Sequence, residues 1–192
     1  MKGKHKYVTD DDALHLGGNK LKGDPCTFCP SSWQYIFEKF DVKTAIDLGS
    51  GLGYAAQWMQ QSGIHVTPVD GLDYNVENSL VPAIKHDLTK GPLVNETVDF
   101  VNCIEVVEHI EEEYVDNLMQ SLTLGNFALI THAVLGQKGW HHVNCQPSSY
   151  WIDKFKEKGF ELLEQESAEI QKLAEADGAK HIARNGMLFK RV

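Results

Sequence analysis

Residues 44–53 read Thr-Ala-Ile-Asp-Leu-Gly-Ser-Gly-Leu-Gly, a short apolar strand that runs into a carboxylate and then into three alternating glycines. Glycine has no Cβ and adopts positive φ, so the backbone can turn sharply here and approach a flat ligand closely. A helix predicted to follow would direct its first N–H groups at the same place. The segment therefore predicts a nucleoside-type cofactor pocket at the carboxyl end of a first parallel strand.

Strand and helix patterns alternate along the chain. Apolar runs predict strands near 43–48, 64–69, 81–86, 98–104, 126–132, 160–163 and 186–190, and helical periodicity falls near 32–40, 53–62, 73–79, 111–122, 148–158 and 166–176. This alternation predicts an α/β fold with a Rossmann-like, mostly parallel sheet and helices on both faces. We interpret residues 1–30 as an N-terminal arm that folds over the pocket with Phe28 or Trp33 near it, and 31–192 as a single domain.

Charge and composition disfavour several classes of protein. Lys and Arg number 18 against 27 Asp and Glu, which gives a net charge of −9. This charge argues against a protein that binds nucleic acid through its phosphate groups. We find no apolar run of signal-peptide length, and none near the roughly 20 residues that span a bilayer. We interpret the four cysteines as reduced thiols of a cytoplasmic protein without a membrane partner. The oligomeric state stays open.

Cys26 and Cys29 have the spacing Cys-x-x-Cys. A zinc site would need two more close ligands. A thioredoxin-like role would need a matching strand and helix around the pair, and the sequence lacks them. We therefore assign the pair no function from the sequence.

Acidic residues end the next two predicted strands. Asp70-Gly71 follows the second strand, and an acid about 20 residues past the glycine loop is placed to accept both ribose hydroxyls. Asp87-Leu88 follows the third strand, where a carboxylate can accept from an adenine amino group while a neighbouring N–H bonds the ring. The carboxylate of Asp47, at the edge of the glycine turn, can accept hydrogen bonds from a cationic ligand.

With its glycine loop, its two acidic strand ends and residues 99–103 as a fourth strand, the chain resembles the class I S-adenosylmethionine-dependent methyltransferases. The resemblance implies seven strands in the order 3-2-1-4-5-7-6, one of them antiparallel. It implies that Asp47 and the glycines hold the methionine end, Asp70 the ribose and Asp87 with Leu88 the adenine. Our candidate cofactor-binding residues are thus Asp47, Gly49, Ser50, Gly51, Gly53, Asp70, Gly71, Asp87, Leu88 and Cys103.

Two alternatives to a methyltransferase stay open. Gly51-x-Gly53-x-x-Ala56 also fits the dinucleotide pattern of an NAD(P)-dependent Rossmann oxidoreductase. Against this reading, the glycine pair lies late relative to the strand, and the chain is short for a dehydrogenase with a separate substrate domain. The second alternative is a non-catalytic protein that binds S-adenosylmethionine.

The fourth strand runs into Glu105-Val-Val-Glu108-His109. If a helix begins here, these two carboxylates and the imidazole share one face and can ligate a divalent cation, either Mg²⁺ or a transition metal. The other reading is a first helical turn in which acids are favoured by the helix dipole. The segment Glu-x-x-Glu-His resembles the metal site of small-RNA 2′-O-methyltransferases and is similar to the O-methyltransferases of ubiquinone biosynthesis. In the RNA enzymes a downstream histidine completes the site, and we prefer His142 for that role.

These residues predict O-methylation of a small-molecule or sugar hydroxyl. The candidate metal ligands are Glu105, Glu108, His109 and His142. Our candidate catalytic residues are Glu108, His109, His132 and His142, because without a metal one of these histidines can act as general base. We expect the loop over residues 136–151 to form the wall that binds the acceptor.

Overall fold

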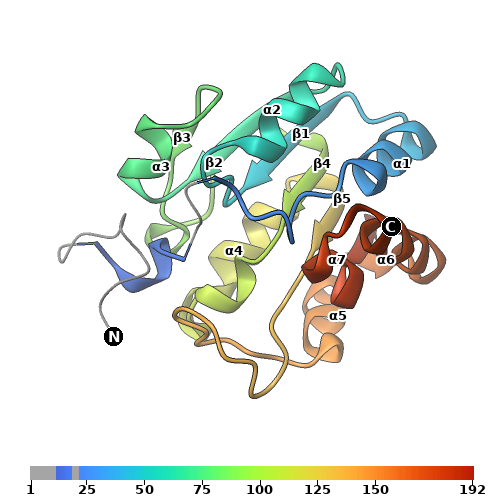
Figure 1. Cartoon of the computed structure of the whole chain (residues 1–192). Helices are drawn as coiled ribbons and strands as arrows, with labels where there is room; N and C mark the ends of the chain where they lie inside the picture. Colours follow the sequence, from blue (N-terminus) through green and yellow to red (C-terminus); the bar gives the residue numbers. More distant parts are fainter. Residues whose placement is uncertain (1–11, 19–21) are drawn as a thin grey trace.

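The computed structural model describes residues 12–18 and 22–192, and in this part of the chain its centre is a seven-stranded sheet (Figure 1). In chain order, the strands are β1 Thr44–Leu48, β2 His65–Asp70, β3 Ile84–Lys85, β4 Val98–Cys103, β5 Gly125–Ile130, β6 Phe160–Leu162 and β7 Met187–Arg191. They lie in the order β3-β2-β1-β4-β5-β7-β6. Strand β7 runs antiparallel to β5 and β6, whereas β1 to β5 pair in parallel. The predicted strand order, with one antiparallel strand, is confirmed.

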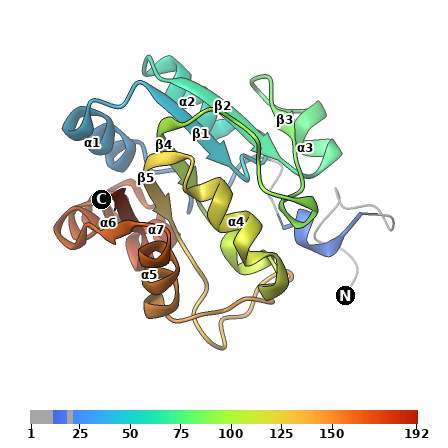
Figure 2. The same ribbon diagram turned by 180° about the vertical axis from the view of Figure 1, so that it is seen from behind.

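Helices cover both faces of the sheet, which Figures 1 and 2 show from opposite sides. They are α1 Pro30–Phe40, α2 Tyr54–Gln61, α3 Asp73–Glu77, α4 Val115–Leu122, α5 Ser148–Glu157, α6 Glu164–Asp177 and α7 Lys180–Asn185. Side chains of β1 alternate between two cores: Ile46 packs with α4 and α5, and Ala45 packs with α1, α2, α6 and α7. This period of two is what a strand buried on both faces requires.

Two local predictions were wrong in extent, and one helix was missed. Strand β3 has two residues instead of six, because Pro82 lacks the N–H that a longer edge pairing would use. The predicted helix over 111–122 begins as a 3₁₀ turn, Glu112–Tyr114, before α4. Helix α7 was not predicted; it follows Gly178, whose φ of 79° ends α6.

The N-terminal arm is only partly described, since residues 1–11 and 19–21 lie outside the described residues. Within it, Leu14–Leu16 form a 3₁₀ turn. Among the described residues, no helix combines the length and apolar character needed to cross a bilayer.

Candidate active site

A cavity of about 1000 Å³ lies at the carboxyl ends of β1, β2 and β4. Its walls come from the loop after β1, from N-terminal residues between 15 and 28, and from the loop after β5. Phe28 and Trp33, which we expected near the pocket, both line it. The volume is at the upper end of the roughly 300–1,000 Å³ that small-molecule sites occupy.

Asp47 presents an unpartnered carboxylate oxygen in this cavity. The side chain is 3% exposed, and its Oδ1 accepts a hydrogen bond of 2.7 Å from Asn102 Nδ2. Asn102 Oδ1 in turn accepts from Trp33 Nε1 at 3.0 Å. Asp47 Oδ2 is buried and has no hydrogen-bond partner in the described chain. Burial, partly offset by the Asn102 hydrogen bond, raises the pKa of Asp47 to about 6. A buried oxygen of this kind fits a cationic group of a ligand.

The loop after β1 depends on glycine. Its glycines have positive φ, with 77° at Gly49, 55° at Gly51 and 78° at Gly53. A Cβ on Gly49 would lie 2.3 Å from Val106 Cγ2, so a side chain does not fit there. Gly51 N donates to Asp70 Oδ2 at 2.8 Å, which fastens the loop to the end of β2. Burial raises the pKa of Asp70, which lines the cavity as do Gly49, Ser50, Gly51 and Gly71.

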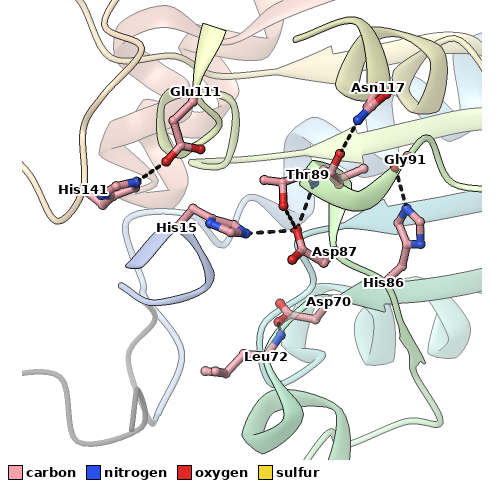
Figure 3. Close-up of polar contacts among 11 residues, drawn as sticks. His15, Asp70, Leu72, His86, Asp87, Thr89, Gly91, Glu111, Asn117 and His141 are labelled. Atoms are coloured by element: carbon pink, nitrogen blue, oxygen red, sulfur yellow. Dashed lines mark hydrogen bonds and ion pairs between the residues drawn. The ribbon is translucent and has the colours of Figure 1, made fainter. Parts of the chain in front are cut away.

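Asp87 contacts the N-terminal segment instead of the cavity. Its Oδ1 accepts from Thr89 N and lies 2.9 Å from His15 Nε2, as Figure 3 shows. The Trp140 indole donates to the Leu14 carbonyl oxygen at 2.8 Å. The 3₁₀ turn around His15 therefore lies between the end of β3 and the loop after β5. Leu88 lines the cavity, whereas Asp87 and Gly53 do not.

Glu108, His109 and His142 form a group of three possible metal ligands. Each offers one ligand atom, and these atoms lie within 4.8 Å of one another. Glu108 is fully buried, and neither of its carboxylate oxygens has a hydrogen-bond partner among the described residues. Burial, and then the charge of Glu105, raises the pKa of Glu108 to about 8. Burial, and then His142 and His141, lowers the pKa of His109 to about 4. A buried side-chain carboxyl group without partners, beside two imidazoles, is a donor set that suits a divalent cation.

Backbone hydrogen bonds bring the downstream loop to this group. Val143 N and Asn144 N both donate to the Glu108 carbonyl oxygen, at 3.0 and 3.1 Å. These bonds place His142 beside Glu108, although 34 positions separate the two in the sequence.

The His142 ring is held from two sides. Its Nδ1 lies 3.3 Å from the Gln137 carbonyl oxygen, and its ring meets that of His109 edge-on with centroids 5.2 Å apart. A Cβ on Gly139 would lie 2.0 Å from His142 Nε2, so the ring needs glycine at that position. An Nδ1–H bonded to a carbonyl leaves Nε2 for a metal, as is usual in metal-binding histidines.

The helix expected over residues 105–109 does not form, so the argument from a shared helical face was wrong. Glu105 has a φ of 56°, and only Val107–His109 form a 3₁₀ turn. The Glu105 carboxylate accepts from Thr131 Oγ1 at 2.9 Å and pairs with His181 Nδ1 at 3.0 Å. Glu105 is therefore outside the group formed by Glu108 and the two histidines.

Two other candidate residues lie away from the cavity. His132 is fully buried, and its Nε2 lies 3.0 Å from Ser148 Oγ. Cys103 is fully buried in the core on the α4 side of the sheet. Neither residue lines the cavity, so we leave both out of the proposal below.

Comparison with known proteins finds similar sequences and similar folds. Residues 46–129 match the methyltransferase domain. The ubiquinone biosynthesis O-methyltransferase of Rickettsia typhi is 31% identical over 115 residues, which cover 51% of this chain and 47% of that protein. The crystal structure of magnesium protoporphyrin IX methyltransferase from Synechocystis with bound SAH has a TM-score of 0.55 and 15% identity, covering 67% of this chain and 70% of that chain. Residues 46–129 are thus similar in sequence to a methyltransferase domain, and the chain has the fold of the class I S-adenosylmethionine-dependent methyltransferases.

The chain spans about half the length of the first curated relatives it matches, 47% and 50%. The 4+2 cyclase SpnF has the same fold, with a TM-score of 0.59 and 13% identity over 93% of this chain and 88% of that chain. Because that protein is named as a cyclase, the shared fold does not by itself fix the reaction of this chain.

Sequence reasoning missed three residues that shape the site. Asn102, which holds Asp47, could have been noticed as an amide inside an otherwise apolar strand, in register with Asp47. Asp24 and His181 also line the cavity, but no local pattern marks them.

Proposed function

We propose that this protein transfers the methyl group of S-adenosylmethionine to a hydroxyl of a small-molecule or sugar acceptor, with help from a divalent metal. One observation carries the proposal. A single cavity has Asp47, with its unpartnered Oδ2, in one wall and His109 and His142, next to the buried Glu108, in another. The O-methyltransferase relative from Rickettsia typhi supports a hydroxyl acceptor.

The residues around the glycine loop fit the cofactor. Asp47 Oδ2 would accept a hydrogen bond from its ammonium group, and the backbone at Gly49 has no side chain to hinder close approach. Asp70 and Leu88 line the part of the cavity that we assign to the ribose and adenine. When bound, the sulfonium supplies an electrophilic methyl carbon. The protein orients the acceptor toward that carbon and excludes water, and orientation of this kind can supply roughly 7–11 kcal/mol.

Glu108, His109 and His142 would hold the metal. Two imidazoles and one carboxylate favour a transition metal over Mg²⁺, which prefers oxygen ligands. When bound, the metal lowers the pKa of a hydroxyl group beside it. His109 is neutral at pH 7 because its pKa is about 4, and it lines the cavity with His142. Without a metal, one of these imidazoles would instead accept the hydroxyl proton.

The same proposal includes the cellular compartment, the size of the acceptor and the division of the chain. All four cysteines are free thiols, which supports a reducing, cytoplasmic compartment. The net charge of −9 supports a small acceptor over a nucleic acid. We treat residues 31–192 as one domain and 1–30 as its arm.

Calorimetry with S-adenosylmethionine, S-adenosylhomocysteine and NAD tests the cofactor. We expect the first two to bind, and binding of NAD alone would favour an oxidoreductase and overturn the proposal. Methyl transfer is then measured with a panel of catechol and sugar hydroxyl acceptors. Each acceptor is assayed with EDTA and again after metal is restored. Turnover that EDTA leaves unchanged would remove the metal from the mechanism. Cofactor binding with no product from any acceptor would support the non-catalytic alternative.

A further inference from the structure

A second group of ligand-type side chains lies at the edge of the cavity. A carboxylate oxygen of Asp24, the Sγ of Cys26 and a ring nitrogen of His181 all lie within 4.8 Å of one another, and all three residues are partly buried. Asp24 and Cys26 precede α1, whereas His181 lies in α7 at the other end of the chain. None of the three belongs to the Glu108 group.

The Cys-x-x-Cys spacing is not what forms this group. Cys29 is fully buried in the core between α1 and the sheet, and burial raises the pKa of its thiol far above the usual range. The two further ligands that Cys26 needs come instead from Asp24, two residues earlier, and from His181.

Hydrogen bonds hold the three residues together. The His181 backbone N–H donates to the Cys26 carbonyl oxygen at 3.1 Å, which joins α7 to the segment before α1. The Cys26 backbone N–H donates to Asp24 Oδ1 at 2.9 Å. The group is therefore built by tertiary contacts and does not depend on chance proximity of mobile side chains.

The Glu105 carboxylate orients the His181 ring, which is the arrangement found behind many metal-binding histidines. Its Oε2 lies 3.0 Å from His181 Nδ1, and its Oε1 accepts from Thr131 Oγ1 at 2.9 Å. Glu105 has a φ of 56°, a conformation that costs energy for a residue other than glycine. Pairing of Nδ1 with a carboxylate selects the tautomer that leaves Nε2 for a metal.

We propose that Asp24, Cys26 and His181 bind a zinc-type divalent cation, with Glu105 as the positioning residue for His181. One sulfur, one nitrogen and one oxygen ligand are a donor set that zinc uses, and three protein ligands leave one coordination position open. Asp24 and His181 line the cavity. The metal therefore ties the N-terminal segment to α7 at the cavity edge. This inference does not depend on methyl transfer.

Cobalt titration of the chelator-treated full chain tests the proposal. A cobalt–thiolate bond gives a near-ultraviolet charge-transfer band that a site made only of Glu and His cannot give. We expect the wild type to show this band, zinc to displace it, and Cys26→Ser to abolish it with loss of one bound metal. Cys145→Ser, at another partly buried thiol, and His142→Ala should keep it. Absence of the band from the wild type, or its persistence in Cys26→Ser, would overturn the proposal.

Variants of the supporting residues separate this site from its competitor. Glu105→Gln should weaken cobalt binding at the thiolate site by roughly 10- to 100-fold, the usual cost of losing a partner behind a metal ligand. His181→Asn should weaken it further. If Cys29→Ala abolishes the band and His181→Asn does not, the cysteine pair binds the metal and the proposed ligand set is wrong. Circular dichroism of each variant verifies that it is folded.

Discussion

Replacement of Glu108 by glutamine should stabilise the metal-free protein while it removes the response to metal. Glu108 is fully buried, and both carboxylate oxygens lack partners among the described residues. An unsatisfied buried polar group costs roughly 1–3 kcal/mol, and more when it is charged. With a pKa of about 8, Glu108 must take up a proton when the chain folds at pH 7, whereas glutamine has nearly the same shape and needs none, so part of this cost disappears. We expect the free energy of unfolding to rise by about 1–2 kcal/mol, or roughly 2–8 °C in Tm for a chain of this size.

Thermal unfolding with EDTA and with Co²⁺ measures both effects. At a free metal concentration one hundred times its Kd, the wild-type site should gain about 2.7 kcal/mol, and Glu108→Gln should gain nothing. The experiment is done in a Cys26→Ser background so that the second proposed site does not contribute. Glu113→Gln, which removes an exposed carboxylate from the same segment, is the matched control and should behave as the wild type.

The reasoning would be refuted by a Glu108→Gln protein that melts below the wild type in EDTA and still shows the full metal-induced shift. The first result would mean that the carboxylate has partners in solution. The second would mean that Glu108 is not a ligand.

The remaining predictions concern the two walls of the cavity. Asp47→Asn should weaken S-adenosylhomocysteine binding by roughly 10- to 100-fold, since a hydrogen bond to a charged group is lost. In calorimetry, the wild-type affinity should fall as the pH drops through about 6, the pKa of Asp47. The affinity of the variant should not change over this pH range. Because the pKa of Asp47 is raised, the folded wild type binds more protons than the unfolded chain between about pH 4 and 6. About 3 kcal/mol of the free energy of unfolding should therefore be lost as the pH rises from about 4 to 6. Urea melts of Asp47→Asn should lack this loss. Gly139→Ala should displace His142 and lower metal affinity at least tenfold, with S-adenosylhomocysteine binding unchanged in calorimetry. Gly49→Ala should cost about 1–3 kcal/mol and weaken cofactor binding; Gly63→Ala, also at positive φ but with open space for a Cβ, controls in the same urea melts for backbone strain alone.

Local sequence patterns determined the fold and the place of the cofactor pocket. Apolar alternation marks strands that are buried on both faces, and the regular return of helices between them leaves few topologies for the sheet. The glycine loop could be recognised in the sequence because the loop needs positive φ and the absence of a Cβ, and these are properties of single residues. The same holds for Asp70, which is the last residue of β2 and could be placed from the apolar pattern of that strand.

Tertiary structure decided which ligands meet. Glu105 and Glu108 are close in sequence, yet the turn at Glu105 directs one carboxylate to His181 and leaves the other with His109 and His142. Asp24 and Cys26 likewise meet a histidine from the far end of the chain. Periodicity describes neighbours within one element, whereas a contact between distant loops depends on how whole elements pack and on where buried N–H and C=O groups find partners. The sequence by itself therefore determined the scaffold and the glycine turn, and only the packed chain decided the composition of both groups of possible metal ligands.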